Sequence, residues 1–363
     1  MKKRFLLTAL PLSAALFLSA CGNDESENNN VNANDSGNDG NNAVNDADET
    51  DNHSDNEVTS GEAQSFRLGH NLAEDHPVHL GLANFAEELE AESGGELTVE
   101  IFPNAVLGDE REVLEQVQVG GVDLTKVSAG ALENFSSAYS AFSLPYVFAD
   151  EDHFFASMET DAVQDLYMQT EDEGFVGLTW YDSGARSFYT QDTPIMHPDD
   201  LQGLRIRVMD SQTQIDMLEA MGGAPTPMPY GEIYTALQQG VVDGAESNPT
   251  ALTNGQHGEV AKAFSFDEHT RIPDILVMSS QSWNSLTEDQ QNMFRVAAER
   301  STEYQKEIWA ESIDEAMEEA EEMGVEFFYP DQEPFLEAVQ PVHEKYRDDE
   351  KIANLLDAFE AIR

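Results

Sequence analysis

Residues 97–127 read LTVEIFPNAVLGDEREVLEQVQVGGVDLTKV and alternate between extended and helical patterns. Residues 97–102 place apolar and polar side chains in turn, a period of two that is typical of a β-strand. The segment that begins at 107–110 carries apolar side chains at helical spacing, at Val113, Leu114 and Val117. Residues 122–127 are a second apolar run of strand length. We therefore predict a strand, a helix and a strand in this order.

The residues before this segment extend the pattern. Residues 66–71 read FRLGHN and predict a strand that leads into a loop. Pro77 then opens a helix, because a missing N–H costs nothing at a helix start, and Gly94-Gly95 ends it. The β-α-β-α-β order predicts a mostly parallel sheet covered by helices, which binds ligands at the loops beyond its strand carboxyl ends. In this sequence those loops hold Asn71, Glu110 and Ser128.

The C-terminal half predicts more strands and one unusual helix. Residues 178–181 and 204–208 are strand-like. Thr287-x-x-Gln290 is a capping box that opens a helical segment reaching about Met323, with Gly324 as its stop. This helix is longer than most helices of globular proteins, so we expect it to cross two lobes or to be kinked.

Charge and composition exclude several classes of function. The 363 residues include 71 acidic and 18 basic ones, a formal net charge of −53. Nucleic acid is excluded as a partner, because binding its phosphates requires Lys and Arg. The single cysteine excludes a disulfide framework and a multi-cysteine metal site. The length and the 40% hydrophobic content suit two domains with a large core.

The N-terminus predicts export. Residues 1–21 begin with a basic cluster and continue as an apolar run, interrupted by Pro11, that is too short and too broken for a permanent membrane span. The run ends in LSAC, which resembles the bacterial lipobox, and that resemblance implies lipid attachment to Cys21. The alternative is an ordinary signal peptide with an incidental cysteine.

Residues 22–62 are acidic, rich in Asn and without Lys, Arg or aromatic residues. Such a composition cannot bury enough apolar surface to fold, so we predict a disordered tether rather than a metal-binding tail. Residues 63–363 remain strongly acidic, with 59 acidic and 15 basic residues. Charges this dense repel one another unless salt screens them, and we therefore expect a halophilic protein that works outside the cell.

Five blocks of sequence resemble the solute-receptor subunit of TRAP transporters, the DctP family. They are 107–111 (LGDER), 143–146 (SLPY), 203–208 (GLRIRV), 225–228 (PTPM) and 234–246 (YTALQQGVVDGAE). The likeness covers about residues 65–345. Residues 267–274, DEHTRIPD, are similar to the sugar-acid receptors of that family.

The resemblance implies an α/β fold with two lobes, like that of periplasmic binding proteins, with hinge strands and a long helix that spans both lobes. Residues 63–183 and 273–312 then form lobe I, and residues 184–272 and 313–363 form lobe II. The lobes are expected to close over one small organic anion.

An arginine in an apolar strand is informative in so acidic a chain. Arginine offers a planar, permanently charged pair of donors that matches a carboxylate. Arg205 and Arg207 both alternate with the apolar residues of 204–208, and periodicity cannot choose between them. The resemblance implies that Arg207 clamps the ligand carboxylate, whereas a surface salt bridge is the alternative. It also implies a second ligand-facing arginine, Arg186, whose alternative is an ion pair at the hinge.

Other site residues follow from the resemblance, each with a structural alternative. Asn71 matches a ligand amide or a turn residue, and Tyr230 matches an aromatic packed over the ligand or a core residue. Asp210 matches a polar ligand contact or a helix cap, and Glu110 matches an acid that meets ligand hydroxyls or a helix N-terminal charge.

The segment from Glu246 to Pro249 departs from the family pattern, which has Asn directly after this Glu; here either Ser247 or Asn248 is expected to contact the ligand. Ser128 and Ala131 stand where sialic-acid receptors carry charged residues, which argues against that ligand. A uronate suits two arginines with amide and acid groups, and a C4-dicarboxylate is the alternative.

The expected function is capture of a sugar acid and its delivery to a TRAP membrane permease driven by a sodium gradient. The protein is then lipid-anchored on the outer face of the cytoplasmic membrane. No G-x-S-x-G, H-E-x-x-H or phosphate-binding loop is present, so we expect no enzyme, no cofactor and no metal site. A cation that assists ligand binding is the alternative, because the family resemblance includes members that bind ligand through one. A sensory receptor with the same fold is the alternative function, and an adhesin does not fit the arginine-bearing body.

Overall fold

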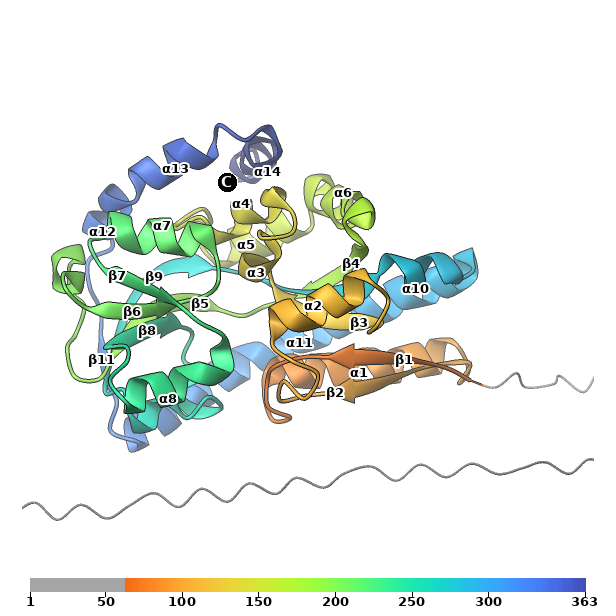
Figure 1. Ribbon diagram of the computed structural model, residues 1–363, viewed down its shortest axis with the longest axis horizontal. Coiled ribbons are helices and arrows are strands. Elements are labelled where there is room, and N and C mark those ends of the chain that lie inside the picture. The colour runs from red at the N-terminus through yellow and green to blue at the C-terminus, as the bar shows by residue number, and fades with distance from the viewer. Residues whose placement is uncertain (1–62) are drawn as a thin grey trace, which may run out of the picture. The chain divides into compact units, whose positions relative to one another are not determined.

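The computed structural model describes residues 63–363, which all belong to the second of the chain's two units, Val58–Arg363. The predicted signal segment 1–21 with Cys21 and the predicted tether 22–62 lie outside the described residues. The described chain is a mixed α/β structure with two separate sheets (Figure 1). The α/β fold class is therefore confirmed.

The first sheet has five strands in the order β2-β1-β3-β10-β4. Their bounds are β1 Gln64–Gly69, β2 Leu97–Phe102, β3 Leu124–Ser128, β4 Phe175–Tyr181 and β10 Asp274–Ser279. Helices α1 (Pro77–Glu92) and α2 (Glu110–Gln118) connect β1, β2 and β3, and β1 pairs in parallel with both β2 and β3. The predicted β-α-β-α-β unit is confirmed, including the start of a helix at Pro77.

The expectation of a mostly parallel sheet is confirmed with one exception, because β10 alone runs against the other four strands. β10 pairs antiparallel with both β3 and β4. The reason lies in the path of the chain, since β4 leads out of this sheet into the second one and β10 brings the chain back beside it. Two neighbouring strands that leave and re-enter a sheet across the same boundary must run in opposite directions.

The second sheet has six strands in the order β11-β9-β5-β8-β6-β7. Their bounds are β5 Ala185–Thr190, β6 Arg205–Val208, β7 Ala224–Pro227, β8 Gly244–Ser247, β9 Ala263–Arg271 and β11 Glu326–Phe328. β6 is parallel to β7 and β8, whereas β5 is antiparallel to β8 and β9. The chain passes between the two sheets from β4 to β5 and from β9 to β10.

Helix α11 (Glu288–Glu322) has 35 residues, which corresponds to a length of about 52 Å. The predicted capping box between Thr287 and Gln290 is confirmed, and the helix ends just before Gly324, which has a φ of 84°. α11 contacts α1 and β4 of the first sheet and α9 (Thr250–Thr253), which follows β8 of the second (Figure 1). The helix therefore lies along both sheets, as expected from its length.

The other helices cover the sheets and one another. They are α3 Ala129–Leu132, α4 Ser140–Ser143, α5 Glu151–Met158, α6 Asp161–Gln169, α7 Gln212–Ala220, α8 Ile233–Gln238, α10 Ser280–Ser285, α12 Glu333–Ala338, α13 Gln340–Tyr346 and α14 Glu350–Glu360. α14 packs against α4, α5 and α6, with the ring of Phe359 5.7 Å from that of Phe142. The C-terminal helix thus reaches elements assigned to lobe I, and the division into two lobes stays a proposal.

Gly81 of α1 lies directly against Gln305 of α11. A methyl group on Gly81 would lie 2.9 Å from both Cβ and Cγ of Gln305. The Gln305 side chain in turn holds the first crossing, because it donates to the carbonyl of Asp182 and accepts from its N–H, both at 2.9 Å. Glycine is therefore needed at position 81, where α1 packs against α11 beside the crossing from β4 to β5.

We predict that Gly81→Ala lowers the free energy of unfolding by about 1–3 kcal/mol, because the methyl group overpacks this contact. At an exposed position inside a helix, a Gly→Ala substitution would instead raise the free energy of unfolding, because alanine favours the helix over glycine by about 1 kcal/mol. Gly231→Ala is the control, since a methyl group there meets nothing within 4 Å. Urea unfolding of both variants measures the difference, and a stabilised Gly81→Ala would contradict the packing argument.

Candidate functional site

A cavity of about 540 Å³ is lined by residues of both sheets. Its walls are built from the loops that follow β1, β3, β6, β7 and β8, and from the residues where the chain crosses between the sheets. The expectation that Asn71, Glu110 and Ser128 border a ligand site at strand carboxyl ends agrees with this position. All eight residues predicted to bind ligand line the cavity: Asn71, Glu110, Arg186, Arg207, Asp210, Tyr230, Ser247 and Asn248.

The two arginines of strand β6 lie in different environments, Arg205 at the surface and Arg207 in the interior. Arg205 is exposed and forms a two-pronged ion pair with Asp243, at 2.9 and 2.7 Å. Arg207 is only 3% exposed, and its Nε and Nη2 donate to the carbonyl of Met228 at 3.0 and 2.8 Å. The surface salt bridge considered for Arg207 thus belongs to Arg205.

Arg207 has little negative charge beside it. Its nearest carboxylate oxygen, Oε1 of Glu246, is 3.8 Å from Nη1 and is already bound by Arg186. Burial and the charge of Arg186 lower the pKa of Arg207 from its usual value, and Glu246 only partly opposes them. An anion entering the cavity would supply the negative charge that this buried guanidinium lacks.

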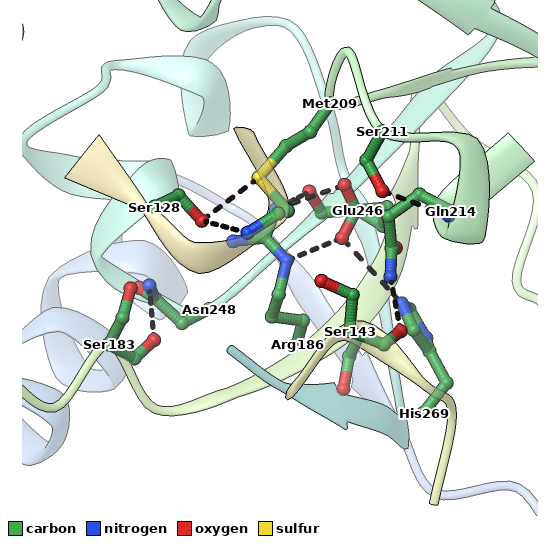
Figure 2. A network of polar contacts seen from close by, with 12 residues as sticks. Ser128, Ser143, Ser183, Arg186, Met209, Ser211, Gln214, Glu246, Asn248 and His269 are labelled. Atoms are coloured by element: carbon green, nitrogen blue, oxygen red, sulfur yellow. Dashed lines mark hydrogen bonds and ion pairs between the residues drawn. The ribbon is translucent and has the colours of Figure 1, made fainter. Parts of the chain in front are cut away.

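Arg186 forms the ion pair that the hinge alternative describes. Its Nε donates to Oε2 of Glu246 at 2.6 Å, and its Nη2 donates to Oε1 and to the backbone carbonyl of Glu246 at 3.0 and 2.8 Å (Figure 2). Glu246 is fully buried, which disfavours its charge, yet Arg186 and His269 bring its pKa to about 2. Arg186 lines the cavity as well, so its pairing with Glu246 and its exposure to a ligand are compatible.

His269 and Asp267, both on β9, support Glu246 from the other side. The Nδ1 of His269 is 2.8 Å from Oδ2 of Asp267, and its Nε2 is 3.6 Å from Oε2 of Glu246 (Figure 2). Burial lowers the pKa of His269, but the two carboxylates outweigh it and raise the pKa to about 9. Sequence reasoning gave neither residue a role, although both belong to the segment DEHTRIPD that resembles the sugar-acid receptors.

A second charged cluster stands on the wall formed by the first sheet. Nζ of Lys126, on the central strand β3, lies 2.7 Å from Oε1 of Glu110 and 3.3 Å from Oδ1 of Asp274. The same Glu110 oxygen accepts from the N–H of Ser128 at 3.3 Å. Lys126 is 2% exposed and its role was missed, although a lysine in an apolar strand is as informative as an arginine. We refer to Lys126, Glu110 and Asp274 as the lysine cluster.

The polar residues at the end of β8 are largely bound to the protein. Nδ2 of Asn248 donates to the carbonyl of Ser183 at 2.9 Å, and its Oδ1 accepts from the N–H and hydroxyl of Thr250 at 2.9 and 2.7 Å. Asn248 is therefore engaged in the hinge, and its neighbour Ser247 borders the same cavity. Oδ1 of Asn71 is buried without a hydrogen-bond partner among residues 63–363. This oxygen is available to a ligand donor.

Asp210 and Tyr230 complete the predicted set. The helix-cap alternative for Asp210 is wrong, because Ser211 caps α7 by accepting from the N–H of Gln214. Asp210 instead accepts from Nη1 of Arg111, on α2, at 2.9 Å, which links the two sides of the cavity. Burial raises the pKa of the Tyr230 hydroxyl, and its ring lies 5.4 Å from that of His257.

A hydrogen-bonded chain also joins the two sides of the cavity. His76 caps α1 by accepting from the N–H of Val78 at its Nδ1, and its Nε2 lies 3.2 Å from Oγ1 of Thr250. The Thr250 hydroxyl then donates to Asn248. Because Nδ1 is an acceptor, the proton of the neutral ring is on Nε2 and is donated to Thr250. The chain thus connects the start of α1 with the crossing residues.

Two further findings concern other kinds of site. Within residues 63–363, no group of three or more His, Cys, Asp or Glu side chains is arranged to hold a metal ion. No helix in that range is long and apolar enough to cross a bilayer.

Two sheets joined by crossing strands, with buried arginines in the cavity between them, define a solute-binding protein. Residues 68–349 match the DctP family, described as bacterial extracellular solute-binding protein, family 7. The chain belongs to this family, the solute-binding proteins of TRAP transporters. The resemblance seen in its sequence is therefore confirmed.

Individual relatives agree with this assignment. The uncharacterized protein YiiZ of Salmonella typhimurium is 42% identical over 289 residues, which cover 79% of this chain and 88% of the relative. A TRAP periplasmic solute binding protein from Anaerococcus prevotii, solved with bound glucuronate, matches with a TM-score of 0.80 and 38% identity, over 82% of this chain and 97% of its own. One from Sulfitobacter, solved with galacturonate, has a TM-score of 0.79, 36% identity and coverages of 82% and 100%.

The raised pKa of His269 predicts a loss of stability in alkali. A group whose pKa rises on folding from 6.5 to about 9 stabilises the fold fully below pH 6.5, and this contribution disappears as the pH rises to 9. We expect the free energy of unfolding to fall on the order of 3 kcal/mol over that range. Urea unfolding at pH 6 and pH 9 measures it. His269→Gln should remove most of the decline and the exposed His197→Gln should keep it; an unchanged decline in His269→Gln would refute the assignment.

Proposed function

We propose that this protein captures a hexuronate outside the cell and delivers it to a TRAP membrane permease. The observation that carries the proposal is the buried guanidinium of Arg207, whose nearest carboxylate is taken up by Arg186. A single ligand carboxylate supplies the missing charge. The solved relatives with bound glucuronate and galacturonate support a sugar acid as the ligand.

The cavity suits one sugar ring rather than a dicarboxylate. Its volume of about 540 Å³ is within the usual range for small-molecule sites. Arg186 is bound to Glu246 by three hydrogen bonds, so the two arginines do not offer two equivalent carboxylate sites. A ligand with one carboxylate and several hydroxyls matches the remaining polar groups.

The proposed roles follow from these positions. Arg207 binds the ligand carboxylate with Arg186 beside it, and Tyr230 packs over the ring. Asn71 accepts from a ligand hydroxyl at its unpaired Oδ1, and Ser247 contacts the ligand next to Asn248. The two remaining acids, Glu110 and Asp210, bind ligand hydroxyls, and Asp210 does so at the edge of the cavity.

Further parts of the proposal concern the cell envelope. The lipobox-like ending of residues 1–21 supports a lipid on Cys21, which holds the protein at the outer face of the cytoplasmic membrane. Residues 22–62 then act as the tether between the lipid and the folded body. We expect no catalysis, because the proposed roles are all those of binding groups.

We predict that Arg207→Ala lowers the affinity for D-glucuronate or D-galacturonate at least about 100-fold, the effect of leaving a ligand carboxylate unpaired in a buried site. Arg205→Ala is the matched control, because it removes the same charge from the same strand but on the exposed side. Isothermal titration in molar salt measures both. Unchanged affinity in Arg207→Ala, or equal loss in Arg205→Ala, would contradict the proposed clamp.

The acidic surface predicts stabilisation by salt. With 71 acidic and 18 basic residues, repulsion between carboxylates opposes folding, and the screening length falls from about 10 Å at 0.1 M to 3 Å at 1 M salt. We expect the melting temperature to rise by several degrees between 0.1 and 2 M NaCl. Sucrose at matched osmolality is the control for effects other than screening, and a flat NaCl response would refute a halophilic adaptation.

A further inference from the structure

The lysine cluster presents a different chemistry from the arginines of the second sheet. Lys126 and Asp274 are 2% and 5% exposed, and Glu110 borders the same cavity. The three residues come from neighbouring elements of the first sheet, namely β3, the start of β10 and the start of α2. The cluster therefore lines the same cavity as Arg186 and Arg207 of the second sheet.

The hydrogen-bonding capacity of the cluster is only partly used. The ammonium group of Lys126 has three N–H donors, and Glu110 and Asp274 accept two of them. Each carboxylate keeps its second oxygen. A ligand thus meets the third N–H of Lys126 between the free carboxylate oxygens of Glu110 and Asp274. A pair of neighbouring hydroxyls can bind all three groups, because each hydroxyl both donates and accepts a hydrogen bond.

The charge of the cluster restricts the ligand in a second way. Two carboxylates share one ammonium, so the cluster carries a net negative charge inside the cavity. Burial and the charge of Glu110 raise the pKa of Asp274 despite the nearby lysine, whereas both carboxylates keep the pKa of Lys126 above its usual value against the effect of burial. A ligand carboxylate can only accept hydrogen bonds and would be repelled here.

We propose that Lys126, Glu110 and Asp274 bind a pair of neighbouring ligand hydroxyls and reject a second carboxylate. This inference rests on the proposed function, because it assumes that a sugar acid enters the cavity with its carboxylate on Arg207. The receptor then selects sugar monoacids and discriminates against aldarates, which carry a carboxylate at both ends. Arg207 binds the carboxylate end of the ligand, and the lysine cluster accepts only hydroxyls at the other end.

D-Gluconate and D-glucarate are a matched pair of probes. Both are open-chain acids of six carbons, and they differ in one terminal group, which is a hydroxymethyl in gluconate and a carboxylate in glucarate. We expect the wild-type protein to bind D-glucuronate and to prefer gluconate over glucarate at least about 100-fold, since like-charge contacts strongly disfavour a wrong partner. Isothermal titration with the purified protein in molar salt measures all three affinities.

Glu110→Gln tests the role of the charge. It keeps the shape of the side chain and its acceptor oxygen for Lys126, but it removes one negative charge. We expect the preference for gluconate over glucarate to fall about tenfold or more, while affinity for glucuronate drops because a hydroxyl loses a charged acceptor. Asp274→Asn should act in the same direction, which gives a second measurement if one variant is poorly folded. Glu115→Gln removes the same charge from the exposed side of α2 and should change nothing.

The outcomes separate the inference from the proposed function. No binding of glucuronate or galacturonate by the folded wild type would remove the proposed function itself. Binding of glucuronate, with a gluconate-to-glucarate preference that is small in the wild type or unchanged in Glu110→Gln and Asp274→Asn, would overturn the lysine cluster as a filter and leave the proposed function intact.

Discussion

The buried ion pair between Arg186 and Glu246 organises the cavity. It joins β5 to β8 by three hydrogen bonds, and His269 holds the far side of Glu246. Because Glu246 is engaged by both neighbours, Arg207 is left with an uncompensated charge 3.8 Å away. Burying charges is costly unless each is paired, and in the proposed function the ligand carboxylate pairs this guanidinium. The binding energy for an anion is thus prepared in the second sheet before any ligand arrives.

In the proposed mode of binding, the two sheets divide the recognition of the ligand between them. The second sheet supplies arginines, which match a planar carboxylate, and the first sheet supplies a lysine shared by two acids, which matches hydroxyls. Each set faces the cavity from strand ends or from the crossings, where loops can carry polar groups without disturbing the ladders of hydrogen bonds. The long helix α11 touches elements of both sheets and holds the first crossing through Gln305. Two sheets connected by a few crossing residues and by α11 are therefore an arrangement that fits a protein with its ligand site between the sheets.

Local pattern predicted most of the elements that build these walls. The period-two and helical repeats of residues 66–127 and the capping box at Thr287 have purely local causes, so their predictions agree with the structure. The direction of β10 could not be predicted in this way, because it depends on where the chain re-enters the sheet. The choice between Arg205 and Arg207 likewise depends on Asp243, a distant acid that pairs with one and not the other. Resemblance to a family made that choice, whereas Lys126 stood outside the resemblance and was missed.

The hydrogen bond from His76 to Thr250 has a consequence for the environment in which the protein can work. Burial, with a smaller effect of Lys126, lowers the pKa of His76 to about 3, so its ring stays neutral and keeps donating to Thr250 well into the acid range. If the two sides of the cavity separated, His76 would lose Thr250 but would still cap α1 through its other nitrogen. Separation at this contact would expose neutral groups only, in contrast to the ion pair between Arg111 and Asp210. The contact between His76 and Thr250 therefore persists when the surroundings acidify.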